Sequence, residues 1–443
     1  MYDIVIVGAG AAGLFCAAMI NDLFPKGMKV LLIEKTETLG NKLIISGSGQ
    51  CNFTRAGAMK DFSLHYGDNY SFIKPALYNL SNTKLIEYFD KQGVQALIRD
   101  DLKVFPKQKS SELIKKVLVR QADKYGVEIK SGHDLKKIEV NEKITLHLMN
   151  SSSRVVIQTE YLILCTGGAS YAETGSTGDI IDLLESLKVK TKAFKPALSV
   201  PFVKYIDDVH VKPQNTAPLA GICLNSAEVS LYRDNKQVLK RNGALLFTHK
   251  GLSGPLILDN SKHFMVGDTI VIYLTEFRDI NDLDKHLLEL IDKHSTMKTK
   301  NLLSELGIPS GLCSFLLNGV PENILNGKCF ALTKLDRKDI VKRLFCMEFS
   351  LLGLGDINEA MCCSGGVDLT EINRENMSLK KYPNIYVAGE CIDVDGDTGG
   401  YNIHAAFAMG YLAVKSIAER SGIACKDKTQ PPPDPSNLEG RKR

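Results

Sequence analysis

Long apolar runs are missing from this chain of 443 residues. No run approaches the ~20 apolar residues that a membrane-spanning helix needs, so we expect no membrane anchor. The first apolar segment starts at Tyr2 without a basic leader, which argues against a signal peptide and predicts a cytoplasmic protein. The apolar fraction of 44% is typical of a globular protein, and the length predicts two or three domains.

Spaced cysteine pairs are also missing. The eleven cysteines include no CxxC or CxxxxC pair, and their scattered positions favour reduced thiols over a disulfide framework. Cys362 and Cys363 are adjacent, which fits either a strained vicinal disulfide or two small core residues. No cysteine set has the spacing of metal ligands, so no metal is expected. The net charge of +4 is too small to indicate nucleic acid or an anionic membrane as a partner.

A glycine-rich turn stands at the start of the chain. The apolar segment 2–7 predicts a buried strand that runs directly into the turn 8–13, and residues 11–23 predict a helix. A second strand, 30–33, then ends at Glu34. This order of strand, glycine turn, helix, strand and carboxylate is the dinucleotide-binding fingerprint in its full context.

Each residue type in the fingerprint has a physical reason. Gly8 permits the tight turn, Gly10 lets the backbone approach a pyrophosphate, and Gly13 allows the helix to pack closely on the strand. The free N–H groups at the helix start favour the anion. Glu34 stands where a carboxylate accepts hydrogen bonds from the adenosine ribose hydroxyls. The fingerprint alone does not separate FAD from NAD.

Small residues dominate the segment 39–52. Residues 46–49 offer unshielded backbone amides, Lys42 supplies a cation and Asn52 an amide side chain. Two interpretations fit: a second cradle around a pyrophosphate and a flavin edge, or a flexible surface loop.

The region from 71 to 159 predicts helices followed by strands. Helices are expected at 84–92 and at 110–125, where Ser110 or Ser111 is the candidate N-cap. Strands of a small antiparallel sheet are expected at 127–129, 135–140, 144–149 and 155–159. The turn around Leu135 is placed to meet an adenine through its backbone. The lysines at 103, 107, 109, 115 and 116 fit either a phosphate-binding surface or a solvated face.

A second strand delivers glycines to the same edge of the sheet. Residues 161–165 predict a strand buried on both faces, and Thr166, Gly167 and Gly168 follow it. Ligands of open α/β sheets bind at this carboxyl edge. The segment 171–178 fits either one more ligand loop or a turn before a helix at 179–187.

The composition changes between 196 and 360. Residues 196–267 predict a β-rich unit, in which His249 lies in a stretch dense in turn formers and fits either a substrate contact or a structural role. Helices are expected at 281–294 and 337–349. We therefore expect an insert with a β half and an α half.

The chain returns to the first domain at 361. A buried strand, 384–390, ends in Gly389 and Glu390, and Glu390 is predicted to accept hydrogen bonds from a polyol such as a ribityl chain. After Gly400 a helix is expected at 403–417, with its amino end facing an electron-rich ring. The acidic residues 393–397 fit a divalent cation less well, because few are spaced as ligands. Residues past 422 predict a disordered tail.

These motifs resemble those of a bacterial family of FAD-dependent oxidoreductases, described as aminoacetone-oxidase-like or bile-acid-reductase-like flavoproteins. The resemblance runs nearly end to end, and its most specific part is the segment 388–402. It implies that FAD is the cofactor and that it lies between the first and last segments. The FAD neighbours that it implies are Gly8, Gly10, Ala11, Gly13, Glu34, Lys35, Lys42, Ser46, Gly47, Cys51, Thr166, Gly167, Gly389, Glu390, Gly400, Tyr401 and Asn402.

The chain departs from the family pattern at two positions. Position 50 is Gln where the family usually has Arg, which implies weaker anion binding near the flavin or a different substrate. His404 stands where the family often has another polar residue.

The expected fold class is α/β, with a Rossmann-like, glutathione-reductase-like FAD-binding domain that is split by an insert. The insert is expected to have a β-barrel part and a helical part. The expected boundaries are 1–194 and 361–425 for the FAD-binding domain, 195–278 and 345–360 for the β-barrel part, 279–344 for the helical part, and 426–443 for the tail.

The resulting hypothesis is an oxidoreductase that transfers a hydride between FAD and a small organic substrate in the cleft between domain and insert. No second GxGxxG unit is present, so NAD(P)H would bind transiently in that cleft. Tyr171, His249 and Tyr401 are candidate proton donors. The alternatives are a flavin-dependent RNA-modifying enzyme, which predicts a basic groove, and a non-catalytic FAD-binding redox protein.

Overall fold

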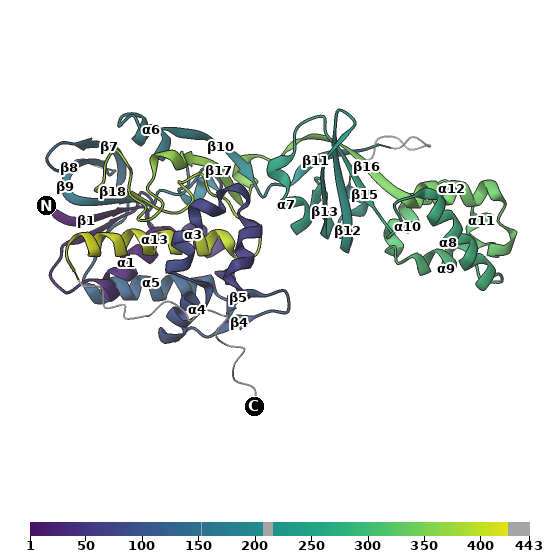
Figure 1. Cartoon of the computed structure of the whole chain (residues 1–443), viewed down its shortest axis with the longest axis horizontal. Helices are drawn as coiled ribbons and strands as arrows, with labels where there is room; N and C mark the ends of the chain where they lie inside the picture. Colours follow the sequence, from purple (N-terminus) through teal and green to yellow (C-terminus); the bar gives the residue numbers. More distant parts are fainter. Residues whose placement is uncertain (152, 207–215, 424–443) are drawn as a thin grey trace.

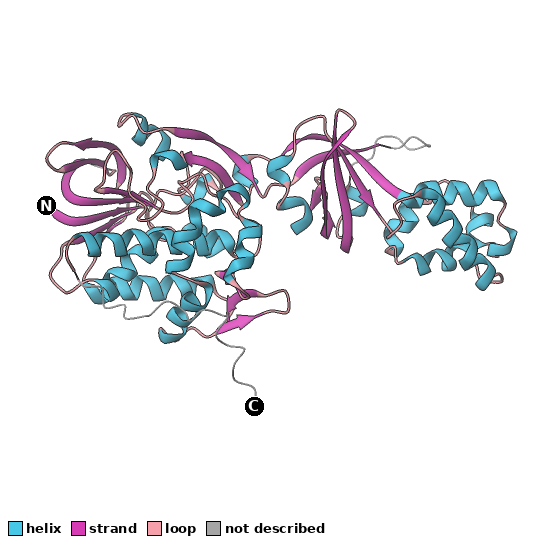
Figure 2. Cartoon of the chain, in the orientation of Figure 1, coloured by secondary structure: helices cyan, strands magenta, loops and turns pink. Residues whose placement is uncertain are grey.

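The computed structural model describes residues 1–151, 153–206 and 216–423. These residues form two bodies, which we call the Rossmann-like domain and the insert (Figure 1). The Rossmann-like domain holds both the first strand and the last described helix, whereas the insert extends away from it as a sheet followed by a helical part (Figure 2). The expected tail 426–443 lies outside the described residues.

A mixed sheet forms the centre of the Rossmann-like domain. Its strands are β1 Tyr2–Val7, β2 Val30–Ile33, β6 Glu128–Lys130, β7 Asp134–Val140, β8 Ile144–Met149, β9 Arg154–Leu164 and β18 Ile385–Val387. The order is β6-β2-β1-β9-β8-β7, with β18 also paired to β9. β1 is parallel to both β2 and β9. The carboxyl ends of these parallel strands meet at one edge, which confirms the Rossmann-like fold class.

One long strand replaces two expected ones. The strands expected at 155–159 and 161–165 are the two halves of β9. The first half pairs antiparallel with β8, and the second half enters the parallel core beside β1. Burial alternates in the first half and is continuous at the end, which explains why the sequence predicted two elements. The expected small antiparallel sheet is therefore an extension of the central sheet formed by β7, β8 and the first half of β9. The expectation that residues 127–129 belong to it is wrong, because β6 pairs parallel with β2 at the other edge.

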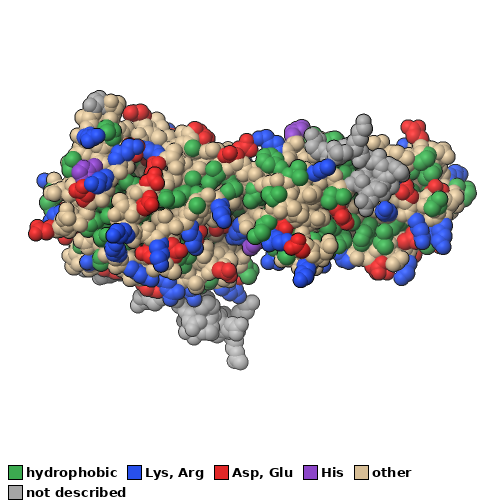
Figure 3. All heavy atoms as spheres, turned by 90° about the horizontal axis from the view of Figure 1, so that it is seen from above, with side chains coloured by type: hydrophobic (Ala, Val, Ile, Leu, Met, Phe, Trp, Pro, Cys, Tyr) green, Lys and Arg blue, Asp and Glu red, His purple; other side chains and the backbone are tan. Residues whose placement is uncertain are grey.

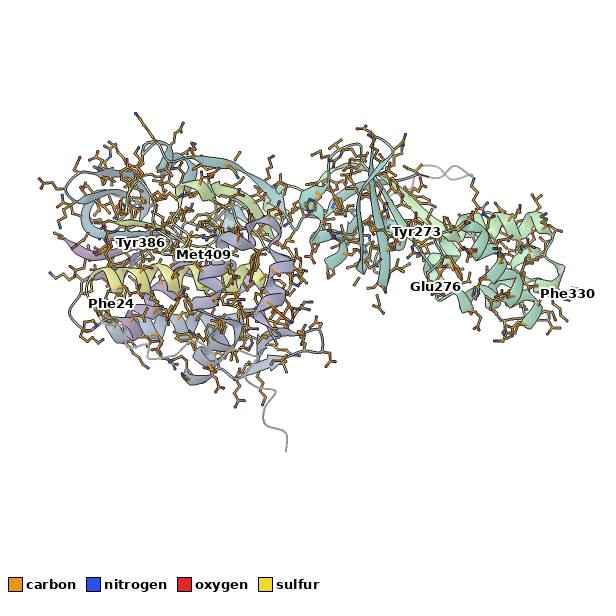
Figure 4. The ribbon with its side chains drawn as sticks, in the orientation of Figure 1. Phe24, Tyr273, Glu276, Phe330, Tyr386 and Met409 are labelled. Carbon is orange, nitrogen blue, oxygen red and sulfur yellow. The ribbon has the colours of Figure 1, made fainter. Side chains whose placement is uncertain are left out.

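Three long helices pack together on one side of this sheet. They are α1 Ala11–Leu23, α5 Ser111–Tyr125 and α13 Tyr401–Arg420. α1 lies between α5 and α13 (Figure 1). Close approach of α13 to α1 needs a glycine, because the Cβ position of Gly410 lies 3.0 Å from the carbonyl oxygen of Ala12. Met409 of α13 and Tyr386 of β18 are labelled inside the domain in Figure 4, and both are buried.

A small sheet lies on the side of the domain from which the insert extends (Figure 1). Its strands are β3 Thr54–Arg55, β4 Ala96–Ile98 and β5 Lys103–Pro106, and their order is β3-β5-β4. Two helices, α3 Tyr70–Asn79 and α4 Asn82–Lys91, lie between β3 and β4 in the chain. Sequence analysis predicted none of these three strands.

The insert begins and ends beside a two-stranded connection, β10 Thr191–Ala197 with β17 Cys362–Val367. Its own sheet has the order β11-β16-β15-β12-β13-β14. The strands are β11 Pro201–Ile206, β12 Cys223–Arg233, β13 Lys236–Phe247, β14 Leu252–Ser253, β15 Thr269–Tyr273 and β16 Cys346–Leu354. The two edges come close, since the Cβ position of Gly251 lies 2.0 Å from the carbonyl oxygen of Pro201. The sheet is therefore barrel-like, as expected.

The helical part follows β15. It contains α8 Ile280–Lys293, α9 Thr299–Leu303, α10 Ser310–Leu316, α11 Glu322–Asn326 and α12 Lys334–Phe345. Thr333 and Asp336 form a capping box that starts α12 three residues earlier than expected. The expectation that this helix reaches residue 349 is wrong, because burial alternates from Cys346 onward and those residues form β16.

In the part of the chain that the structure describes, no helix is both long enough and apolar enough to cross a membrane.

Candidate active site

The glycine turn between β1 and α1 forms one end of a groove. The Cβ position of Gly13 lies 1.8 Å from the carbonyl oxygen of Gly8, so a side chain at Gly13 would collide with the turn. By contrast, apart from Gly10 itself and its two chain neighbours, no described heavy atom lies within 4 Å of the Cβ position of Gly10. This open space lies at the start of α1, where free N–H groups favour an anion. The turn therefore fits a bound pyrophosphate.

Glu34 follows β2 and lies beside this turn. Its Oε2 accepts a hydrogen bond from the N–H of Ala9 (2.7 Å), and its Oε1 accepts from the N–H and hydroxyl of Thr36 (2.9 Å each). These bonds fix the carboxylate at the groove. An ionised carboxylate has about four acceptor positions, and three are used, so Glu34 retains about one for a ribose hydroxyl.

The groove extends along the carboxyl ends of β1, β2 and β9. The sequence-predicted residues that line it are Gly8, Gly10, Glu34, Lys35, Lys42, Leu135, Thr166 and Gly167. The buried hydroxyl oxygen of Thr166 has no hydrogen-bond partner among the described residues. Because a buried polar atom ordinarily has a partner, Thr166 fits a ligand that supplies one.

The segment 171–178 forms part of the groove wall. Thr174, Gly175 and Ser176 line the groove, so this segment is more than a turn before α6 Ile180–Glu185. Lys35 ties the wall to β2 through an ion pair with Asp179 (2.6 Å). Burial opposes ionisation of Asp179, but the hydrogen bonds from Lys35 and Thr177 and the charge of Lys35 together outweigh burial and hold the pKa of this carboxyl below its usual range.

Lys42 and Glu390 join the first and last segments of the chain. Lys42 lies on the short helix α2 Asn41–Ile45, and its Nζ is 2.6 Å from Oε2 of Glu390. Burial disfavours the charged lysine, but the carboxylate of Glu390 outweighs it and raises the pKa of Lys42. The other oxygen of Glu390 accepts the N–H of Cys363 (2.9 Å). Hydrogen bonds from a flavin ribityl chain would therefore share these oxygens with protein donors.

The segment 46–51 forms a tight turn after α2. The N–H of Cys51 donates to the carbonyl of Ser46 (3.0 Å), and Gly47 has a left-handed backbone (φ +56°). Cys51 is fully buried, and burial raises the pKa of its thiol to about 12. Cys51 therefore stays a neutral thiol at physiological pH.

A cation lies beside Gln50, although Gln50 itself lacks the charge of the arginine that the family usually has at this position. Oε1 of Gln50 accepts a hydrogen bond from Nη2 of Arg99 (2.8 Å). The guanidinium of Arg99 also lies 3.9 Å from the ring centroid of Phe105. No sequence signal pointed to Arg99, because the contact joins residues 49 positions apart.

Three of the predicted residues hold the last segment in place. Asn402 accepts a hydrogen bond from the N–H of Gly396 and donates one to its carbonyl (2.8 Å each), which closes the loop before α13. The Cβ position of Gly400 lies 2.7 Å from the carbonyl oxygen of Thr54, and that of Gly389 lies 2.9 Å from Cβ of Ala12. Side chains at these two glycines would push α13 and β18 away from the first segment.

Tyr401 lies against an imidazole that sequence analysis missed. The ring of His65 stacks on Tyr401 with centroids 4.3 Å apart, and its Nδ1 lies 2.8 Å from Oδ2 of Asp397. Burial raises the pKa of the Tyr401 hydroxyl well above its usual range, so Tyr401 stays neutral. His65 and Asp397 are 332 positions apart, and no motif spacing could connect them.

The other two candidate proton donors lie in different places. The ring centroid of Tyr171 is 5.8 Å from Nζ of Lys42, which places Tyr171 near the groove. His249 is exposed and lines a separate hollow at the base of the insert with Phe202 and Glu359. The structure therefore does not bring His249 to the groove.

The insert contacts the loop before α13. Oδ1 of Asp259 accepts the N–H of Thr398 (2.6 Å), and Nζ of Lys262 pairs with Asp395 (3.1 Å). Burial raises the pKa of Asp259 to about 6, and the nearby charge of Asp397 adds to this effect. The insert is thus fastened to the segment that carries Tyr401.

The acidic side chains of this loop form hydrogen bonds and ion pairs with neighbouring residues. Asp393 accepts the N–H of Gly365 (2.8 Å), while Asp395 and Asp397 pair with Lys262 and His65. Within residues 1–151, 153–206 and 216–423, no group of three or more His, Cys, Asp or Glu side chains could hold a metal ion.

Comparisons with known proteins agree with this geometry. A family model, HI0933-like protein Rossmann domain, matches residues 2–416. A ribosomal RNA dihydrouridine synthase of Escherichia coli (strain K12) is 28% identical and aligns over 94% of this chain and 98% of its own length. A 3-dehydro-bile acid delta(4,6)-reductase of Clostridium scindens is 24% identical, over 95% of this chain and 100% of its own length.

Among solved structures, 3-ketosteroid delta1-dehydrogenase from Sterolibacterium denitrificans aligns with a TM-score of 0.49 and 12% identity, over 95% of this chain and 99% of that one. The family match covers the glycine turn, the groove and the start of α13. The chain therefore belongs to the HI0933-like Rossmann family and is a FAD-dependent oxidoreductase.

Proposed function

We propose that this enzyme reduces a carbon–carbon double bond conjugated with a carbonyl group, and that its substrate is a uridine base in ribosomal RNA. The names of two relatives support the bond type. Dihydrouridine is uridine with two hydrogens added across C5 and C6, beside the C4 carbonyl, and a delta(4,6) bond system in a 3-oxo bile acid is likewise conjugated. Two relatives with unlike substrates share this one type of reduction.

The observation that carries the proposal is the convergence at the loop 395–401. His65 stacks on Tyr401 and bonds to Asp397, and two residues of the insert, Asp259 and Lys262, contact Thr398 and Asp395 of this loop. A substrate that enters between the domain and the insert would meet a proton carrier and a cation at this loop.

The reaction adds a hydride to the carbon β to the carbonyl and a proton to the carbon α to it. When bound, FAD supplies the hydride, and NAD(P)H is the proposed source of its electrons. His65, whose Nδ1 lies 2.8 Å from Asp397, is the proposed proton carrier, because a positioned imidazole is the side chain that most often transfers protons in catalysis. Arg55, with its guanidinium carbon 6.0 Å from the ring centroid of Tyr401, is placed to stabilise negative charge on the substrate carbonyl oxygen.

The test is anaerobic reduction of the purified holoenzyme with NADH or NADPH, followed by addition of ribosomal RNA that lacks the modification. Oxidised flavin absorbs near 450 nm, and we expect this absorbance to return only when the RNA is added. Mass spectrometry of the digested RNA should then show one uridine that is heavier by about two mass units. His65→Gln should slow this re-oxidation and leave reduction by NAD(P)H unchanged. RNA that remains unmodified after incubation with the fully reduced holoenzyme would reject the proposal.

A small conjugated enone is the second candidate substrate. Acidic and basic side chains are interspersed over the face shown in Figure 3, so no broad basic field marks an RNA surface there. The same anaerobic assay separates the two candidates. Re-oxidation by a cyclic enone, with none by RNA, would favour the small substrate that the sequence predicted.

A further inference from the structure

A row of cations crosses one face of the small sheet β3-β5-β4. Arg55 is paired with Lys103 in the sheet, so both side chains lie on the same face. Phe105 follows two residues after Lys103 and therefore lies on that face too, as does Arg99, which stacks on its ring. The opposite face is occupied, because Thr54 and Val104 are fully buried and Thr54 bonds to His404 of α13 (2.9 Å).

The row starts at the candidate active site. The Cβ position of Gly399 lies 3.3 Å from Nη1 of Arg55 and 3.8 Å from Cε of Lys103. Gly399 belongs to the loop that closes before α13, next to Tyr401. The cations therefore extend from the loop 395–401 outward to Arg99 at the end of the β4–β5 hairpin. A polymeric ligand that placed one of its units at the loop 395–401 would therefore extend across this face of the small sheet.

Two of the cations, Lys103 and Arg99, are held in position by neighbours. Asp101 pairs with Lys103 (2.8 Å), and Gln50 accepts a hydrogen bond from Arg99 (2.8 Å). Phe105 covers one face of the Arg99 guanidinium, with 3.9 Å between the guanidinium carbon and the ring centroid. Arg99 makes no other side-chain hydrogen bond with the described residues. Its remaining N–H groups and its outer face are thus available to a phosphate or to a stacked base.

We propose that this face, through Lys103 and Arg99, binds the phosphates of the RNA strand that flank the base being reduced, while Arg55 at its inner end meets the base itself. The inference rests on the proposed function. An RNA strand fits because it repeats negative charges at a spacing that a row of cations can follow, and because bases stack on guanidinium planes. It also gives Lys103 a role among the lysines that the sequence left between a phosphate surface and a solvated face.

The test is binding of a short, uridine-rich, single-stranded RNA to the holoenzyme, followed by fluorescence anisotropy over a series of salt concentrations. Each lost phosphate contact should lower the slope of log K against log salt by about 0.7. We expect Arg99→Gln and Lys103→Gln each to lower the slope by about that amount and to weaken binding severalfold at low salt. The double variant should lower the slope by about twice as much.

Lys136→Gln is the matched control. Like Lys103, Lys136 pairs with an aspartate two residues before it, Asp134, but it lies on β7 at the far edge of the central sheet (Figure 1). The salt slope of RNA binding by Lys136→Gln should equal that of the wild type. Absence of RNA binding by the wild type, or equal slopes for Lys103→Gln and Lys136→Gln, would overturn the inference.

The two proposals fail in different ways. If the row binds RNA but no uridine is reduced, the binding surface stands and the proposed reaction is rejected. If a uridine in the RNA is reduced but substitutions in the row leave the salt slope of RNA binding unchanged, the proposed reaction stands and the binding surface is rejected.

Discussion

At the scale of single residues, Gly10 and Gly13 show how similar glycines serve different purposes. A Cβ at Gly13 would meet the Gly8 carbonyl at 1.8 Å, whereas a Cβ at Gly10 would meet no described protein atom within 4 Å. We therefore expect Gly10→Ala to fold normally and to lower FAD affinity about tenfold or more, because the methyl group takes the space of the pyrophosphate. FAD titration of the apoprotein measures this.

Gly353→Ala in β16 is the control for this prediction. Its Cβ position is also free of described atoms within 4 Å, but it lies in the insert. FAD affinity should be unchanged. Equal affinity of Gly10→Ala and wild type would show that the pyrophosphate does not approach this turn.

The raised pKa of Asp259 predicts that the stability of the protein depends on pH through the junction with the insert. Its pKa is raised to about 6 by burial and by Asp397, so the folded state favours the protonated carboxyl. The stability that this group contributes is fully present below the ordinary pKa of 3.8 and is lost as the pH rises through about 6. Asp259→Asn keeps an acceptor for Thr398 and removes the charge. It should raise the free energy of unfolding at pH 8 by up to about 3 kcal/mol.

The measurement for Asp259 is chemical denaturation of wild type and variant from pH 5 to pH 8. The advantage of Asp259→Asn should be larger at pH 8 than at pH 5. A difference that does not change with pH would mean that Asp259 is not titrating in this range.

At the scale of elements, His404 joins three parts of the Rossmann-like domain. From α13 it contacts Thr54 of β3 (2.9 Å) and the carbonyl of Leu80, which follows α3 (2.8 Å). Complete burial lowers the pKa of His404 to about 4. The unfolded chain binds a proton near pH 6.5 and the folded state does not, so stability is lost as the pH falls from about 6.5 to about 4. The loss should approach about 1.4 kcal/mol per pH unit.

His404→Gln isolates this effect. At pH 7.5 the variant should be less stable by about 1–3 kcal/mol, because a buried hydrogen-bonded group is altered. Between pH 6.5 and pH 5 its stability should fall less steeply than that of the wild type. Parallel pH profiles would contradict the assignment of acid sensitivity to His404.

The sequence predicted those elements whose pattern is local. β1, α1, β2 and Glu34 follow one another within a short segment, and their glycine spacing and apolar runs predicted both the fold class and the groove. The insert, with its β and α halves, was recognisable from its composition. The resemblance added FAD as the cofactor and named Lys35, Lys42, Thr166 and Gly167, which line the groove.

What the sequence did not predict depends on contacts between distant segments. The pair of His65 with Asp397, the bond of Asp259 to Thr398 and the contact of Gln50 with Arg99 each join separate elements. β3, β4 and β5 are too short to show a period, so the small sheet went unrecognised. His249, by contrast, stood out in the sequence and lies away from the groove.

At the scale of the whole molecule, the described residues form two large and separate hydrophobic cores. One core is built from residues of the Rossmann-like domain and the other from residues of the insert, between Val203 and Leu351. Within the part of the chain that the structure describes, the junction has a small apolar cluster, Ala197, Leu198, Leu258 and Cys362, besides its polar contacts. Domains joined by so little apolar surface ordinarily keep independent stability.

Two thermal transitions are therefore expected for the holoenzyme in calorimetry. Added FAD should raise the midpoint of one transition, because it binds the folded Rossmann-like domain, and should leave the other unchanged. Limited proteolysis at intermediate temperature, with mass spectrometry of the fragments, would assign the unshifted transition to residues between 198 and 361. A single transition that FAD shifts as a whole would mean that Asp259, Lys262 and their partners couple the two cores. In that case cofactor binding would also control the position of the insert.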